Sequence, residues 1–166
     1  SMFAGQFESA IEAAQAITET LTADLLVVER PHMAVTLEGY HSTVVHVLVR
    51  FGKWQDIIDM ALPDDPVLYC VSTAMCHYAR SVAHSALGHI ESAEDEQSLF
   101  VQVREQIPKS RLFFNNTAHD ILAIAESMMM GELEYRKGNY DDAFNHLETA
   151  ALLDDNLYYS EPWAWM

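Results

Sequence analysis

The stretch Gly138-Asn139-Tyr140-Asp141-Asp142-Ala143 decides the fold of this chain. It consists of a glycine, a variable residue, a large apolar residue, two polar residues and a small apolar residue. Glycine adopts the left-handed backbone of a tight turn without steric cost, so the pattern predicts a turn into the second helix of an antiparallel pair. We expect the large residue to wedge under the turn and the small one to let the two helices approach closely.

The same pattern occurs at three earlier points, with spacings of 47, 36 and 50 residues between successive glycines. Around each glycine, apolar residues recur every three or four positions, which is typical of amphipathic helices. Irregular periods of this length favour a stack of helical hairpins, and no heptad persists as a coiled coil requires. We therefore predict an all-α chain. The earlier stretches are Gly5-Gln6-Phe7-Glu8-Ser9-Ala10, Gly52-Lys53-Trp54-Gln55-Asp56-Ile57 and Gly88-His89-Ile90-Glu91-Ser92-Ala93.

Prolines and capping residues mark where the predicted helices begin and end. Pro63 and Pro108 lack the amide hydrogen that a helix interior needs, so we expect each to end a helix. In Asp65-Pro66 the aspartate can accept hydrogen bonds from free amides and the proline suits a first turn, so this pair is expected to begin a helix. Asn116 or Thr117 is expected to cap the helix that follows Pro108.

The last predicted hairpin also resembles a known family, the tetratricopeptide repeat, over nearly a whole repeat of about 34 residues. The resemblance implies a right-handed α-α superhelix of antiparallel hairpins, with about three and a half units in this chain. It also implies that the first helix of each hairpin lines a concave groove. The matching residues are Met130-Gly131, Gly138, Tyr140, Ala143, Leu147 and Ala150, with a partial match at Ser81, Gly88, Ile90 and Ala93.

Three further segments resemble a group of uncharacterised tetratricopeptide proteins that carries no established activity. They are Arg50-Phe51-Gly52-Lys53-Trp54, His77-Tyr78-Ala79-Arg80 and Tyr159-Ser160-Glu161-Pro162-Trp163. This second resemblance adds to the fold prediction and implies no function.

We expect residues 3–166 to form one helical-repeat domain, and we interpret residues 1–2 as the remnant of an expression tag. Because Ser160-Glu161-Pro162-Trp163 is typical of a helix start, we expect the chain to be a fragment of a longer array. Trp163, Trp165 and Met166 would then mark a surface that the next repeat covers.

Composition narrows the classes of partner. The formal net charge is -16, so phosphate backbones and anionic membranes are repelled and a basic protein or peptide is attracted. No apolar run approaches the roughly 20 residues that span a bilayer. Cys70 and Cys76 are six residues apart, which favours free thiols over a disulfide or a CxxC site. With no secretory signal, these features favour the cytoplasm.

The predicted function is non-catalytic recognition of a protein or peptide in the concave groove. The candidate set mixes polar and aromatic side chains, as peptide grooves do, but lacks the paired lysine and arginine clamps that hold a peptide carboxyl terminus. The simpler alternative is that these residues only pack or face water. The set is His46, Arg50, Tyr78, Val82, Met128, Glu132 and Tyr135.

Two other functions stay open. A helical domain that binds a metal or small molecule could use histidines of the first helices: His41, His77, His84 and His119. A zinc site needs three or four converging ligands, and neither HExxH nor HxxxH is present, so no metal or other cofactor is expected. The second alternative is self-assembly, with exposed repeat ends stacking between chains into a homo-oligomer.

An enzyme is not expected, because the motifs of nucleophilic catalysis and phosphate binding are missing. The acidic pairs have simpler explanations. Asp141-Asp142 suits a helix start, Asp154-Asp155 a helix end, and Glu94-Asp95-Glu96 a solvent-facing helix surface.

Overall fold

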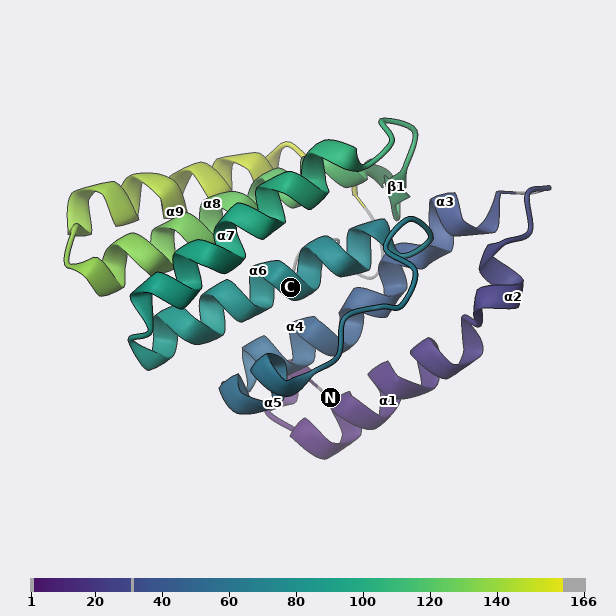
Figure 1. Cartoon of the computed structure of the whole chain (residues 1–166), viewed down its shortest axis with the longest axis horizontal. Coiled ribbons are helices and arrows are strands. Elements are labelled where there is room, and N and C mark those ends of the chain that lie inside the picture. The colour runs from purple at the N-terminus through teal and green to yellow at the C-terminus, as the bar shows by residue number, and fades with distance from the viewer. Residues whose placement is uncertain (1, 31, 160–166) are drawn as a thin grey trace.

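The computed structural model describes residues 2–30 and 32–159, and its secondary structure is almost entirely helical (Figure 1). The predicted all-α class is confirmed. Two short antiparallel strands, β1 (Leu112–Phe113) and β2 (Asn116–Thr117), form the one sheet of the described residues. The helices are η1 (Met2–Ala4), α1 (Phe7–Thr20), α2 (Ala23–Leu26), α3 (Met33–Leu37), η2 (Glu38–Ser42), α4 (Thr43–Arg50), α5 (Trp54–Asp59), α6 (Cys70–Leu87), α7 (Ile90–Gln106), α8 (Ala118–Lys137) and α9 (Tyr140–Asp155), where η denotes a 3-10 helix.

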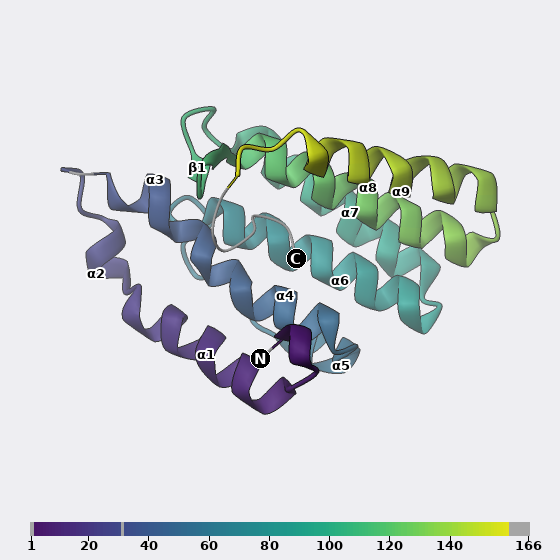
Figure 2. The same cartoon turned by 180° about the vertical axis from the view of Figure 1, so that it is seen from behind.

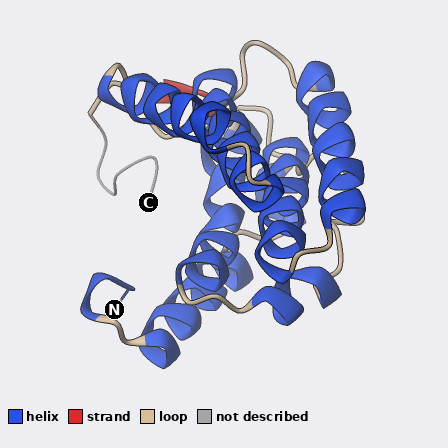
Figure 3. Cartoon of the chain, turned by 90° about the vertical axis from the view of Figure 1, so that its left-hand side faces the viewer, coloured by secondary structure: helices blue, strands red, loops and turns tan. Residues whose placement is uncertain are grey.

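Two long antiparallel pairs, α6/α7 and α8/α9, lie side by side (Figure 1, Figure 2). Helix α8 packs against both α6 and α7, so it occupies the angle between them. On the other side of α6 lie α4 and α5, and α1 packs against α4. In the view from one end, the strand pair takes up only a small area at the edge of the helices (Figure 3). No described helix is both long enough and apolar enough to cross a bilayer.

The predicted turns are confirmed at all four glycines. Gly5, Gly52, Gly88 and Gly138 have φ angles of 69°, 63°, 80° and 85°, in the left-handed region that side chains disfavour. Gly88 and Gly138 end α6 and α8, and the amides at and after each glycine donate to carbonyls of the last helical turn. Each long hairpin therefore closes through the same C-terminal cap.

Small residues bring the two helices of each long hairpin together, as the pattern predicted. On α8, a Cβ added at Gly131 would lie 2.7 Å from the side chain of Leu147 and 3.2 Å from the carbonyl oxygen of Ala143. At the corresponding place in the preceding hairpin, the Ser81 hydroxyl donates to the Ala93 carbonyl at 2.9 Å. Both positions lie seven residues before a turn glycine, so the two hairpins share one packing geometry.

Helix starts follow the predicted caps, with one shift. Thr117 caps α8 by accepting from the Asp120 amide at 3.2 Å. Asp65 Oδ1 accepts from the Val67 and Leu68 amides at 3.0 Å each, but this forms only a turn, and α6 begins later, at Cys70. The predicted helix start at Asp65-Pro66 is therefore several residues too early.

The core centres on α6, of which 14 of 18 residues are buried. Both cysteines lie on this helix and are free, buried thiols, as predicted. The large residues Phe7, Trp54 and Ile90 are half-buried beneath their turns. Tyr140 departs from the pattern, because 54% of its surface is exposed and it does not wedge under the last turn.

Candidate protein-binding surface

The structure buries part of the predicted groove set. His46 on α4 is 5% exposed, and Tyr78 and Val82 on α6 are 4% and 8% exposed. Tyr78 and Val82 belong to the main apolar cluster of the protein. These three residues are core positions, so the prediction that they line an open groove is wrong.

The remaining members of the set reach solvent to different degrees. Arg50 is exposed at the end of α4, and Met128 and Glu132 are half-buried on α8. Tyr135, also on α8, is 44% exposed. Arg136 joins two of them, because its Nε donates to Glu132 at 2.9 Å while its guanidinium lies 5.8 Å from the centre of the Tyr135 ring.

Tyr135 belongs to an exposed aromatic cluster. The other two members of this cluster, Tyr140 and Phe144, are not in the predicted groove set. The Tyr135 ring centre lies 5.2 Å from that of Tyr140 and 6.4 Å from that of Phe144, both on α9, in edge-to-face arrangements. Tyr140 and Phe144 are 54% and 53% exposed. We call Tyr135, Tyr140 and Phe144 the aromatic face.

Such a cluster is informative because grouped aromatic side chains dominate the energy of protein interfaces, and contiguous exposed apolar surface marks binding sites. The sequence alone places Tyr140 in the turn pattern and Phe144 one residue after the small Ala143. Whether such positions face a neighbouring helix or solvent depends on the next element in space.

The candidate metal-binding histidines do not converge. His41 Nε2 and His119 Nε2 donate to the backbone carbonyls of Leu21 and Ile107, at 2.9 Å each. His77 Nδ1 lies 2.6 Å from Glu96 Oε2, and burial lowers the pKa of His84. Within residues 2–30 and 32–159, no three His, Cys, Asp or Glu side chains are placed to hold a metal ion. These four histidines are therefore not gathered at one place in the described structure.

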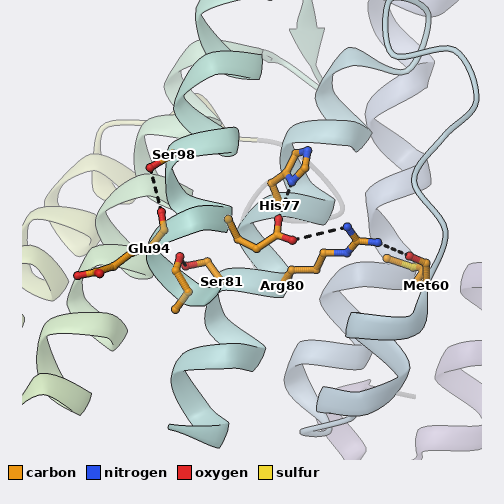
Figure 4. Close-up of polar contacts among 8 residues, drawn as sticks. Met60, His77, Arg80, Ser81, Glu94 and Ser98 are labelled. Atoms are coloured by element: carbon orange, nitrogen blue, oxygen red, sulfur yellow. Dashed lines mark hydrogen bonds and ion pairs between the residues drawn. The ribbon is translucent and has the colours of Figure 1, made fainter. Parts of the chain in front are cut away.

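His77 instead belongs to a polar network between α5, α6 and α7 (Figure 4). Arg80 donates to the Met60 carbonyl at 2.6 Å and lies 3.6 Å from Glu96 Oε1. The Glu96 side chain is 15% exposed and points inward, which corrects the expectation that Glu94-Asp95-Glu96 faces solvent as a unit. The network ties the end of α5 and the middle of α7 to α6.

The described thiol beside this network, that of Cys76, is not activated. Burial raises the pKa of the neighbouring Cys76 thiol to about 11, so the thiol stays protonated near neutral pH. The pKa of Cys70 is likewise raised, mainly by burial. The geometry therefore suits a structural brace.

An apolar hollow of about 400 Å³ lies between α1 and the α3–η2 segment. It is open at the surface, and its lining is apolar apart from the hydroxyl-bearing residues Thr20 and Tyr40. Its lining residues are Ala16, Ile17, Thr20, Leu21, Leu37 and Tyr40.

No family model, curated protein or solved structure matches this chain. The resemblance to tetratricopeptide repeats therefore stays a prediction, carried by the internal repeats. Within the described part of the chain, the aromatic face groups three exposed aromatic side chains.

Proposed function

We propose that this chain is a non-catalytic scaffold that binds a protein or peptide partner through the aromatic face. The observation that carries the proposal is the grouping of three half-exposed rings, Tyr135, Tyr140 and Phe144, on the last hairpin. Two helices fix the backbones of these residues, so little conformational entropy is lost when a partner packs on the rings. The proposal moves the binding site from the predicted groove to the end of α8 and the face of α9.

Charge supports a protein partner over nucleic acid or an anionic membrane. The chain has 25 acidic and nine Lys or Arg residues. A surface of this sign repels phosphates and attracts basic protein surfaces.

Two further features belong to the same proposal. The repeated turn and the small residues at Ser81 and Gly131 support tetratricopeptide-like hairpins as the unit of the scaffold. The free, buried thiols of Cys70 and Cys76 favour a reducing compartment such as the cytoplasm.

The test compares the wild-type chain with a Tyr135→Ala/Phe144→Ala variant in quantitative capture from an extract of the source cells. A Leu99→Ala variant is the matched control, because Leu99 is 41% exposed on α7, outside the aromatic face. We expect specific partners to be depleted about tenfold or more by the double variant and retained by the control, with unchanged helicity and melting temperature. An identical set of captured proteins in all three samples would contradict the proposal.

Sedimentation velocity over a range of protein concentrations tests self-assembly, the competing use of the same surface. A mass that doubles with concentration in the wild type and stays monomeric in the double variant would replace the proposed partner by a second copy of this chain. A monomer in both samples is the expected result.

A further inference from the structure

The four turn glycines define corresponding positions in four successive units. The second and sixth residues after each glycine lie one helical turn apart on the helix that follows. The pairs are Phe7 and Ile11, Trp54 and Ile58, Ile90 and Glu94, and Tyr140 and Phe144.

In each of the first three units, the helix that begins the next hairpin packs beside these positions. Phe7 and Ile11 pack with Val47 of α4, and the Phe7 ring lies 5.3 Å from that of Phe51, directly after α4. Trp54 and Ile58 are half-buried against the main core, and their helix α5 packs on α6.

In the third unit, Glu94 of α7 forms an ion pair with Lys137 of α8 at 2.7 Å. A second ion pair joins Arg104 to Glu126 of α8 farther along the same interface. The covering helices are thus α4, α6 and α8 in turn.

The fourth unit lacks such a cover within the described part of the chain. Tyr140 and Phe144 are 54% and 53% exposed, whereas their apolar counterparts Phe7, Ile11, Trp54, Ile58 and Ile90 are all half-buried. The charged counterpart, Glu94, is exposed and reaches Lys137 of α8. Helix α9 lies at the outer edge of the stack in both views (Figure 1, Figure 2).

Two more pairs of corresponding positions show the same difference in exposure between the third and fourth units. Ser85 on α6, three residues before its turn glycine, is 0% exposed, whereas its counterpart Tyr135 is 44% exposed. Val101 on α7 packs against the core, whereas its counterpart Ala151 on α9 is exposed. The uncovered surface therefore lies in the angle between α8 and α9. It corresponds to the surface in the angle between α6 and α7 that α8 covers in the preceding unit.

Building on the proposed function, we propose that the aromatic face binds one amphipathic helix of a partner protein, with lysine or arginine along the flanks of its apolar stripe. This helix packs on α9 in the position that α4, α6 and α8 take on the preceding units. Its apolar stripe contacts Tyr140, Phe144 and Ala151, and one edge of it reaches Tyr135.

The charge of the partner helix follows from the composition of α9. Residues 140–155 contain Asp141, Asp142, Glu148, Asp154 and Asp155 and no Lys or Arg. In the described structure, Asp141, Asp142 and Glu148 take part in no ion pair. The α7–α8 interface is bordered by opposite charges, so an interface on α9 requires the incoming helix to supply the positive ones.

The same charges disfavour a second copy of this chain as the occupant. Two α9 helices face to face would bring like charges together at the rim of the interface, between molecules that each carry a net charge of -16.

The test uses three labelled synthetic peptides of about 18 residues, or five helical turns. The first has leucines at three- and four-residue spacing with lysine flanks. The second has the same leucines with glutamate flanks, and the third has the composition of the first with its leucine spacing scrambled. Fluorescence anisotropy measures their dissociation constants from the full chain at low and moderate salt.

We expect the lysine-flanked peptide to bind at least tenfold more tightly than either of the others, and more weakly as salt is added. A Tyr140→Ser/Phe144→Ser variant is expected to lose about tenfold in affinity or more, while a Leu99→Ser control keeps it. Hydrogen exchange should show added protection along residues 140–151 when the peptide is bound.

The inference is overturned if the scrambled peptide binds as tightly as the patterned one, or if the double variant binds the patterned peptide as well as the wild type does. It is also overturned if the patterned peptide does not bind. A captured partner that depends on Tyr135 and Phe144 but is not displaced by the lysine-flanked peptide would overturn the helix inference and leave the proposed function standing. If the wild-type chain neither captures a partner that depends on Tyr135 and Phe144 nor binds the lysine-flanked peptide, both the helix inference and the proposed function are overturned.

Discussion

At the scale of single residues, the buried carboxylate of Glu38 holds the start of the central helix. Its oxygens accept from the Ser72 amide at 2.8 Å and the Val71 amide at 3.3 Å, at the N-terminus of α6. Free amides at a helix start need acceptors, and here the acceptor comes from η2, more than 30 residues earlier in the chain. Glu38 thus replaces the local cap that Asp65 was expected to provide.

Burial raises the pKa of Glu38 above its ordinary value of 4.5, against the opposing effects of Ser72 and Arg111. The folded state therefore keeps the proton to a higher pH than the unfolded chain. The stability linked to this proton is present below about pH 4.5 and is lost as the pH rises through the folded pKa.

A Glu38→Gln variant has no such proton. We expect the free energy of unfolding of the wild type to fall relative to that of the variant as the pH rises from about 4 to about 7. Urea denaturation across this pH range measures the difference. Parallel curves for the two proteins would show that the pKa of Glu38 is the same in the folded and unfolded states.

At the scale of the elements, the α8–α9 contact depends on the missing side chain of Gly131. A Cβ at this position would lie 2.7 Å from both Cγ and Cδ2 of Leu147, so the helices must separate or Leu147 must change rotamer. Gly131 lies within a helix, where alanine is preferred by about 1 kcal/mol. Its presence there is explained by packing.

We expect Gly131→Ala to lower the free energy of unfolding by about 1–3 kcal/mol, because the overlap outweighs the gain in helix propensity. In a Leu147→Ala background the same substitution should lose at least half of this effect, since the overlapping atoms are gone. A double-mutant cycle in urea measures the coupling energy. Equal effects in the two backgrounds would mean that Leu147 is not the obstacle.

At the scale of the whole molecule, negative charge opposes the compact state. The chain carries 25 acidic and nine Lys or Arg residues, and folding brings these charges closer together. The ion pairs of the described residues use only a few of the carboxylates, among them Glu94, Glu126 and Glu132.

Added salt should therefore stabilise the fold. Raising sodium chloride from about 20 mM to about 300 mM is expected to increase the midpoint of urea denaturation, because screening weakens repulsion between separated surface charges. An Asp141→Asn/Asp142→Asn variant should show a smaller salt dependence. A midpoint that falls with salt in the wild type would mean that the ion pairs matter more than the excess negative charge.

The local features of the fold were predictable from the sequence, because they depend on the conformational limits of individual residues. Glycine at positions 5, 52, 88 and 138 marked left-handed turns, and the four turns lie there. Small residues marked the close contacts within the hairpins, at Ser81, Gly131, Ala93 and Ala143. These rules act over a few residues or a single pair of helices.

The location of the candidate site depended on which helices contact each other. The spacing of residues along the sequence does not predict these contacts. Tyr78 and Val82 have the helical spacing of a groove surface, yet both lie in the core because α6 is the central helix. Glu96 turns inward because His77 and Arg80 lie opposite it, and Glu38 reaches α6 from a distant segment.

Tyr140 and Phe144 repeat a pattern whose apolar residues are half-buried in every earlier unit, and they are exposed because no described helix packs beyond α9. The turns and helix pairs of this protein thus follow from its sequence, since local backbone and packing limits act within each hairpin. The aromatic face follows from the tertiary structure, since the exposure of a helix surface is set by the neighbour that packs on it.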